Sequence, residues 1–155
     1  MVDTNHKIAF CIDSDGCAMD TMTYKHQLFF GPIAADIFGI SEQERTSFLK
    51  EWEEQGLLKY VDDIYCQDRG KKEDVIATLI ANDYCRDTIL MVGDSPGDLA
   101  AAEQNGIAFY PVLVGKEVKS WEILREDIGE AFAKGQFEQQ RQKESINTFW
   151  ANLDN

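Results

Sequence analysis

The chain has 155 residues, a length typical of one domain, and 44% of its residues are hydrophobic, enough to form one buried core. Its 15 basic and 28 acidic residues give a formal charge of −13, which argues against binding to nucleic acids or to anionic membrane surfaces. No apolar run reaches the ~20 residues of a membrane-spanning helix, and we expect no signal peptide. The four cysteines form no CxxC pair, so we expect no zinc site, no disulfide and a reducing, cytoplasmic setting.

The first half of the chain alternates between short apolar runs and helical patterns. Residues 7–12 form a continuously apolar run, which predicts a strand buried on both faces of a sheet. Residues 42–55 follow a capping-box pattern and place apolar side chains on one helical face. Residues 63–67 predict a weaker second strand, and residues 72–82 carry apolar side chains at helical spacing.

The second half repeats this alternation with clearer signals. Residues 88–93 and 107–114 are apolar runs that predict two further buried strands. Between them, residues 96–104 predict a helix, with Pro at its first position and Asn-Gly just past its end. Residues 117–133 predict a long helix whose apolar stripe consists of Val118, Trp121, Leu124, Ile128 and Phe132. A polar tail at 136–149 ends in Phe149 and Trp150, which we expect to dock on the core.

The order of these elements predicts the fold class. Strands that alternate with helices indicate an α/β fold, with a parallel sheet between two layers of helices in a three-layer, Rossmann-like arrangement. We expect a single domain over residues 1–155. In such sheets the functional site lies at the carboxyl ends of the strands.

Acidic residues follow two of the predicted strands. Asp13 and Asp15 come directly after the first strand, and Asp94 and Asp98 follow the third. If these strands are neighbours, Asp13, Asp15 and Asp94 should converge at one sheet edge. Like charges held that close need a cation, and Mg²⁺ fits best because it takes few carboxylates and binds substrate phosphates. Each residue alone is equally well explained as a turn or cap, but two acidic clusters together favour a site.

Two lysines open the predicted helix at 72–82. The helix dipole disfavours cations at this end, by about 0.3–1 kcal/mol, and Glu73 and Asp74 partly offset that cost. Lys71 or Lys72 could therefore serve a nearby anion, although an ordinary solvated charge cluster explains the pair equally well when it is considered alone.

The acidic motifs resemble those of the haloacid dehalogenase-like superfamily of phosphohydrolases. The first motif of that family is an apolar strand followed by DxDx[TV], and residues 8–17 (IAFCIDSDGC) match it with Cys17 in the last place. The fourth motif is an apolar strand ending in GDxxxD, which residues 89–98 (ILMVGDSPGD) match fully. The resemblance covers about residues 7–115 and implies the core fold of this family, with residues 116–155 as a helical extension.

The resemblance also implies a mechanism. Asp13 would attack the phosphorus of a small phosphorylated metabolite, and Asp15 would act as general acid and then as general base. Lys72, with Lys71 as the weaker choice, would match the lysine of the third motif and stabilise the phosphoryl group. The Mg²⁺ ligands would be Asp13, Asp15, Asp94 and Asp98.

The second motif of the family is not recognisable. It is a Ser or Thr at the end of an apolar strand, and residues 18–60 contain no convincing strand of that kind. The chain resembles a core that lacks this strand and any substantial cap domain. A sheet that is one strand short could recruit an edge strand from a second chain, so the oligomeric state stays open.

Two alternatives follow from these observations. The chain could be a catalytically impaired member of the family that binds a ligand or a partner. It could also be a receiver-type signalling domain, although the DxD spacing and the position of the lysine fit that class less well. Phosphate labelling of Asp13, rather than of an Asp in the middle of the chain, would separate the receiver alternative from a phosphohydrolase.

Overall fold

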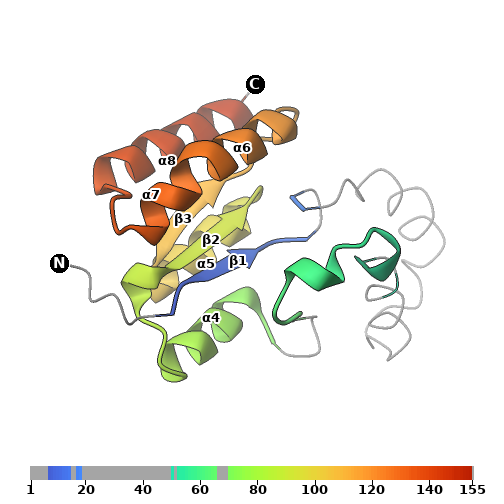
Figure 1. Ribbon diagram of the computed structural model, residues 1–155. Coiled ribbons are helices and arrows are strands. Elements are labelled where there is room, and N and C mark those ends of the chain that lie inside the picture. The colour runs from blue at the N-terminus through green and yellow to red at the C-terminus, as the bar shows by residue number, and fades with distance from the viewer. Residues whose placement is uncertain (1–6, 15–16, 19–49, 51, 66–69, 155) are drawn as a thin grey trace, which may run out of the picture. The chain divides into compact units, whose positions relative to one another are not determined.

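Figure 1 shows a computed structural model of the chain, which describes residues 7–14, 17–18, 50, 52–65 and 70–154. The chain divides into two compact units, one made of Met1–Thr23 and Lys72–Asn155 and the other of Tyr24–Lys71. Within the described residues, no helix has the length and apolar character needed to cross a membrane. The sheet and its covering helices belong to the first unit.

The described residues of the first unit form a parallel sheet of three strands. The strands are β1 (Ala9–Ile12), β2 (Ile89–Gly93) and β3 (Ala108–Pro111), in the order β1-β2-β3. Parallel pairing places Ile12 beside Val92, and Val92 beside Tyr110. The predicted α/β class and the predicted parallel sheet are confirmed, and the layout is compatible with a Rossmann-like fold.

The strand predicted at 63–67 is wrong for its described part. Residues 63–65 form no strand, and residues 66–67 lie outside the described residues. The Asp63 carboxylate accepts a hydrogen bond from the backbone N–H of Ile64 at 2.8 Å. Such a local bond takes up a backbone donor that a strand would use in its ladder. The described part of the chain therefore contributes three strands rather than four.

Helices of the first unit connect and follow the strands. They are α4 (Lys72–Ala81), α5 (Pro96–Asn105), α6 (Glu117–Ile123), α7 (Gly129–Ala133) and α8 (Gln139–Leu153), with a 3-10 turn η4 (Arg86–Thr88) before β2 and a π-helical turn η5 (Leu124–Ile128) between α6 and α7. In the second unit, residues 50 and 52–54 are helical and Leu58–Tyr60 form the 3-10 turn η2. The rest of the helix predicted at 42–55, up to residue 49 and at residue 51, lies outside the described residues.

Helix α5 begins and ends where its sequence predicts. The side chain of Ser95 accepts a hydrogen bond from the Asp98 N–H, and the Asp98 carboxylate accepts one from the Ser95 N–H, which completes a capping box. Gly106 ends the helix at φ 64°, a left-handed conformation that glycine adopts without a steric penalty. These caps place Asp98 in the first turn of the helix, immediately after β2.

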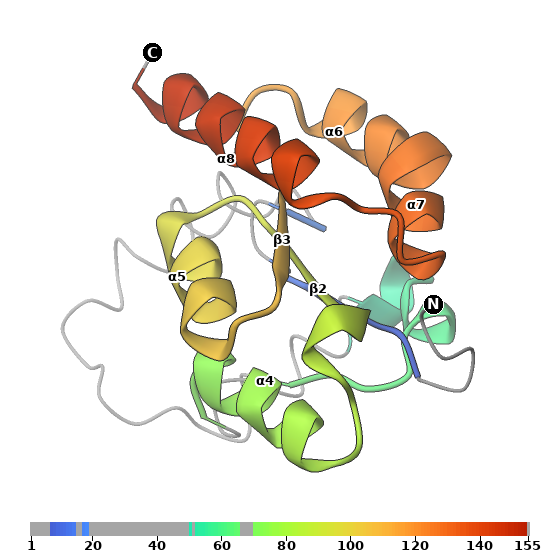
Figure 2. The same cartoon turned by 90° about the vertical axis from the view of Figure 1, so that its left-hand side faces the viewer.

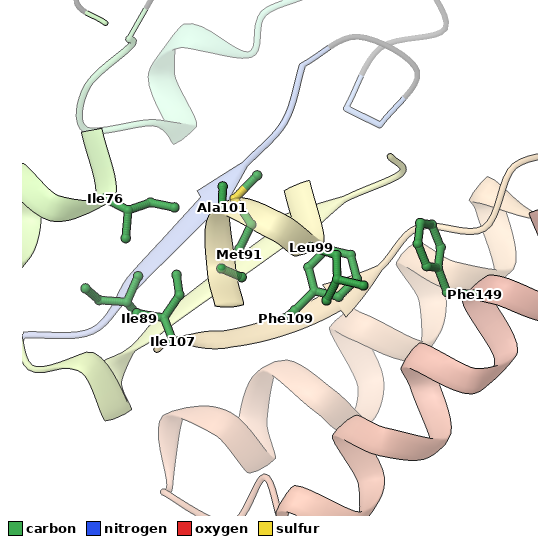
Figure 3. Close-up of a cluster of buried hydrophobic side chains, with 9 residues drawn as sticks. Ile76, Ile89, Met91, Leu99, Ala101, Ile107, Phe109 and Phe149 are labelled. Carbon is green, nitrogen blue, oxygen red and sulfur yellow. The ribbon is translucent and has the colours of Figure 1, made fainter. Parts of the chain in front are cut away.

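Helices cover both faces of the sheet. Apolar residues of β2 and β3 pack on one face with α4, α5 and α8, as Figure 3 shows for Ile76, Ile89, Met91, Leu99, Ala101, Ile107, Phe109 and Phe149. On the other face, Leu90, Val92, Tyr110 and Val112 pack with Leu124, Ile128 and Phe132 of the η5–α7 segment. Helix α4 packs against α5, and α8 packs against β3 (Figure 2). Strand β2 is buried throughout because it lies between two strands and two helical layers.

The helical extension differs from its prediction in three details. The long helix predicted at 117–133 contains the π-helical turn η5. Gly129 directly follows this turn, and it leaves little room for a side chain, because a Cβ there would lie 2.9 Å from the carbonyl oxygen of Leu124. Val118 is 75% exposed and is not part of the buried stripe. Phe149 docks as expected, edge to face with Phe109 at 5.8 Å, whereas Trp150 remains 44% exposed.

Strand β1 is the exception to the predicted burial on both faces. Its residues alternate between partly buried and exposed positions, and Ile8, Phe10 and Ile12 are each about two fifths exposed. The opposite face of the strand, with Ala9 and Cys11, packs against the core under α4 and α5. The apolar run at 7–12 therefore belongs to an edge strand, within the part of the chain that the structure describes.

Candidate active site

Four charged residues gather at the carboxyl end of the sheet. Asp13 directly follows β1, Asp94 directly follows β2, Asp98 lies in the first turn of α5, and Lys72 is the first residue of α4. The parallel pairing of β1 with β2 continues through a hydrogen bond from the Asp13 N–H to the Val92 carbonyl, at 2.9 Å. Neighbouring strands thus deliver these acidic residues to one edge, as their positions in the sequence predict.

The three carboxylates lie close together, and the Lys72 ammonium contacts two of them. One oxygen from each of Asp13, Asp94 and Asp98 lies within 4.8 Å of the other two. The Lys72 Nζ is 2.8 Å from an Asp13 oxygen and 2.5 Å from an Asp98 oxygen. When all four groups are ionised, their net charge is −2. A divalent cation would neutralise this charge.

Asp98 is the most constrained member of the cluster. Its side chain is fully buried, and one carboxylate oxygen accepts a hydrogen bond from Lys72. The other oxygen accepts bonds from the Ser95 N–H at 3.0 Å and from the Ser95 hydroxyl at 2.7 Å. Both oxygens are therefore engaged in holding Lys72 and the start of α5 in place.

Gly93 provides the space that Asp98 occupies. A Cβ at this position would lie 2.4 Å from the Asp98 Cγ and from one of its carboxylate oxygens. Contacts this short do not occur in folded proteins, so a larger residue at position 93 would displace the carboxylate. The glycine of the GDxxxD motif thus has a packing role beside its place at the end of β2.

Burial and mutual repulsion change how the acidic groups titrate. Burial raises the pKa of Asp13 above its ordinary value, and repulsion from Asp98 adds to this, whereas the hydrogen bond from Lys72 opposes it. Burial, followed by repulsion from Asp13 and Asp98, raises the pKa of Asp94 to about 6. Burial alone would lower the pKa of Lys72, but its hydrogen bonds to Asp13 and Asp98 outweigh that effect and raise it. Lys72 therefore stays charged at neutral pH.

Two hydrogen bonds hold the loop after β1, and the sequence reveals neither of them. The indole N–H of Trp121 donates to the backbone carbonyl of Cys17 at 3.0 Å, so α6 anchors this loop. The loop is closed by a bond from the Ala18 N–H to the Asp13 carbonyl at 3.2 Å. The spacing places Trp121 on the apolar stripe of the predicted helix, but it does not indicate that the indole N–H reaches the loop.

Cys17 is a packing residue. Its side chain is 5% exposed, and its thiol lies 3.8 Å from the Val92 carbonyl. Burial, with repulsion from Asp13 and its neighbours, raises the pKa of this thiol far above its ordinary value. Because the thiolate is the reactive form, the burial of Cys17 and its raised pKa both disfavour a role as nucleophile. The described cysteines, Cys11, Cys17 and Cys85, form no disulfide.

The remaining site predictions are answered only in part. Asp15 lies outside the described residues, as do most of the residues among which the second motif was sought. Of the two candidate lysines, it is Lys72 that contacts Asp13 and Asp98. The hydroxyl of Ser14, next to Asp13, is buried and has no hydrogen-bond partner among the described residues.

The donor set fits a hard divalent cation. Carboxylate oxygens are the preferred ligands of Mg²⁺, and the cluster carries the charge that such an ion balances. Ser95 holds one carboxylate oxygen of Asp98, and Lys72 holds the other. Asp13 and Asp94 are not held in this way by both residues, so they are better placed than Asp98 to bind a metal ion. Asp98 would act mainly by fixing Lys72.

No protein-family model, no curated protein and no solved structure matches this chain.

Proposed function

We propose that the chain is a Mg²⁺-dependent phosphohydrolase with a haloacid dehalogenase-like core, which hydrolyses a small phosphorylated metabolite through a phosphorylated Asp13. The supporting observation is the position of the Lys72 ammonium, which contacts Asp13 and Asp98 while Asp94 lies within 4.8 Å of both carboxylates. The sequence motifs around Asp13 and Asp94 supply the reaction type, and the geometry supplies the charge arrangement that this reaction requires.

The first half-reaction transfers the phosphoryl group to Asp13. A carboxylate oxygen of Asp13 attacks phosphorus, the bond between phosphorus and the ester oxygen breaks, and the leaving alkoxide takes a proton from Asp15. Lys72 offsets the negative charge on Asp13 and on the transferred group. Asp13 and Asp94 would hold a Mg²⁺ ion, which would supply Lewis-acid neutralisation of the phosphoryl charge.

The second half-reaction regenerates the enzyme. Asp15, now deprotonated, takes a proton from water, which attacks the phosphorus of the aspartyl phosphate. The bond between phosphorus and the Asp13 oxygen breaks, and inorganic phosphate leaves.

Phosphate release from a panel of small phosphomonoesters, measured with Mg²⁺ and with excess chelator, tests this proposal. Turnover that requires Mg²⁺ supports it. Mg²⁺ binding without turnover of any ester would favour the alternative, a catalytically impaired protein that binds a ligand or a partner at this site.

Replacing Lys72 by Met is expected to lower kcat by about 10²–10³-fold, the usual cost of losing one donor that stabilises transition-state charge. The substitution removes the ammonium that contacts Asp13 and Asp98, so the pKa of Asp13 should also rise. The control is Lys71→Met, which makes the same change one residue earlier. An equal loss in both variants, or a loss only in Lys71→Met, would contradict the assignment of Lys72.

The affinity for Mg²⁺ is expected to fall below about pH 6. The pKa of Asp94 in the metal-free protein is about 6, and the cation binds the ionised carboxylate, so protons and Mg²⁺ compete. Binding should release part of a proton near pH 6 and almost none well above it. Titration calorimetry in buffers of different ionisation enthalpy measures this release, and an affinity that is independent of pH between 5 and 7 would contradict it.

The same raised pKa predicts how the metal-free fold responds to pH. The folded state holds the Asp94 proton more tightly than the unfolded state, whose value is near 3.8. The contribution of this group to stability should therefore decrease as the pH rises from about 4 to about 6, and Mg²⁺ should restore it. Thermal unfolding across this range, with and without Mg²⁺, measures both effects.

A further inference from the structure

The backbone of Asp13 is held by hydrogen bonds on both sides. Its N–H donates to the Val92 carbonyl at 2.9 Å, and its carbonyl accepts a bond from the Ala18 N–H at 3.2 Å. The first bond continues the pairing of β1 with β2, whereas the second closes the loop after β1. The direction in which the Asp13 side chain leaves the sheet therefore depends on the Ala18 N–H as well as on the sheet.

A single peptide unit connects Asp13 to helix α6. The carbonyl of Cys17 and the N–H of Ala18 belong to the same peptide bond, which is planar and trans, so the two groups point in opposite directions. The carbonyl accepts the indole N–H of Trp121 at 3.0 Å, and the N–H donates to Asp13. Holding the oxygen therefore fixes the direction of the N–H, and consecutive hydrogen bonds of this kind polarise and strengthen one another.

Helix α6 is itself fixed to the sheet next to Trp121. Ser120 is 3% exposed, and its hydroxyl accepts a hydrogen bond from the Leu113 N–H at 3.0 Å. The carbonyl of Ser120 accepts a bond from the hydroxyl of Tyr110, a residue of β3, at 2.8 Å. Among the described strands, β3 and β1 lie on opposite sides of β2. Trp121 thus reaches from an element fixed at β3 to the loop after β1.

The acceptor distinguishes Trp121 from an ordinary packing residue. Trp121 is partly buried and packs against the apolar cluster that includes Val92 and Leu124. A tryptophan in such a position usually finds a hydrogen-bond partner for its N–H, which by itself implies no role in a site. Here the partner belongs to the peptide that donates to the backbone of Asp13, so the chain of bonds ends at a residue of the charged cluster.

We propose that Trp121 is a positioning residue for the nucleophile: through the peptide between Cys17 and Ala18, it holds the Asp13 backbone in the conformation that aims the carboxylate at phosphorus. This inference rests on the proposed function. It gives the helical extension, which lies beyond the resemblance to the phosphohydrolase family, a part in the reaction. Attack geometry matters, since a displacement of about 1 Å can lower a rate about a hundredfold.

The Trp121→Phe variant keeps an aromatic ring and removes the N–H. We expect kcat to fall about 10–100-fold while KM for the ester stays near the wild-type value, because Trp121 positions Asp13 and binds no part of the substrate. The matched control is Trp150→Phe, the same change at a position of α8 that is 44% exposed on the same unit of the chain. It should leave kcat unchanged. An equal loss in both variants, or no loss in Trp121→Phe, would overturn the proposal.

A second variant separates the hydrogen bond from the packing of the ring. Benzothienylalanine at position 121 has nearly the shape of tryptophan, but sulfur replaces the N–H, so the apolar contacts are kept and the donor is lost. We expect this variant to lower kcat as much as Trp121→Phe does. Wild-type kcat in the benzothienylalanine variant would show that the ring matters rather than the bond, and the proposal would then be wrong.

Hydrogen exchange tests the anchor without reference to turnover. The Ala18 amide should exchange faster in both variants, because its peptide is no longer held at the Cys17 oxygen. The Val112 amide, which donates to the Gly93 carbonyl at the end of β2, should keep its wild-type rate. Unchanged exchange at Ala18, or an equal increase at Val112, would overturn the proposal. A wild-type chain that hydrolyses no ester would instead contradict the proposed function, and the exchange rates alone would then decide whether Trp121 holds the loop.

Discussion

The Asp13→Asn variant is expected to lose Mg²⁺-dependent phosphate release, with turnover lowered by roughly a thousandfold or more, because a carboxamide cannot form the aspartyl phosphate. Asn has nearly the same size as Asp, so the surrounding packing is retained. Burial and repulsion from Asp98 already disfavour the ionised form of Asp13, so we expect the variant to remain folded. The initial rate of phosphate release at saturating Mg²⁺ measures the effect.

The control for this variant is Asp87→Asn. It makes the same chemical change at an exposed position of the 3-10 turn before β2, on the same unit of the chain. Its turnover should equal that of the wild type. Turnover that survives in Asp13→Asn would show that another group accepts the phosphoryl or that water attacks the ester directly, and the proposed role of Asp13 would then be wrong.

The Gly93→Ala substitution is expected to destabilise the fold by about 1–3 kcal/mol, the usual cost of overpacking a core, and to lower turnover as well. The new methyl group would lie 2.4 Å from the carboxylate of Asp98, whose side chain is fully buried and cannot move into solvent. Displacing it would break its bonds to Ser95 and Lys72. Urea unfolding measures the loss of stability, and the rate of phosphate release measures the displacement of Lys72.

Gly97→Ala is the matched control, four residues along in the first turn of α5. A Cβ there would meet the Ser95 hydroxyl at 3.5 Å, an ordinary contact, and alanine favours the helix over glycine. This variant should be as stable as the wild type or slightly more stable. Equal destabilisation in both variants would mean that glycine is needed at these positions for a reason other than the space that Asp98 occupies.

The elements near the site could be predicted because their signals are local. The apolar run of β2 is long enough to require burial on both faces, and it is the central strand. Pro96 at the start of α5 and Gly106 at its end mark both helix boundaries, and the structure has them there. Two acidic motifs that follow parallel strands must share an edge once those strands are neighbours, so the meeting of Asp13 with Asp94 follows from topology.

Other features depend on tertiary contacts that the sequence pattern does not encode. An apolar run indicates burial but not how much, so the half-exposed face of β1 could not be distinguished from the buried faces of β2. The bond from Trp121 to the loop after β1 joins residues 104 positions apart. The sequence predicts the capping box in which one carboxylate oxygen of Asp98 bonds to Ser95. It does not predict that Lys72 donates a hydrogen bond to the other oxygen. The apolar run at 63–67 predicts a strand, but it does not show that the Asp63 carboxylate takes up the Ile64 N–H.

The most direct test of the proposed function is to identify the phosphorylated residue. The chain is incubated with Mg²⁺ and a phosphomonoester that it hydrolyses, then treated with borohydride, which reduces an aspartyl phosphate to homoserine at the position where it formed. Peptide mass mapping locates the change. We predict homoserine at position 13 in the wild type and none in chelator. Modification of another carboxylate, or phosphate release under the same conditions with no trapped residue, would contradict the account.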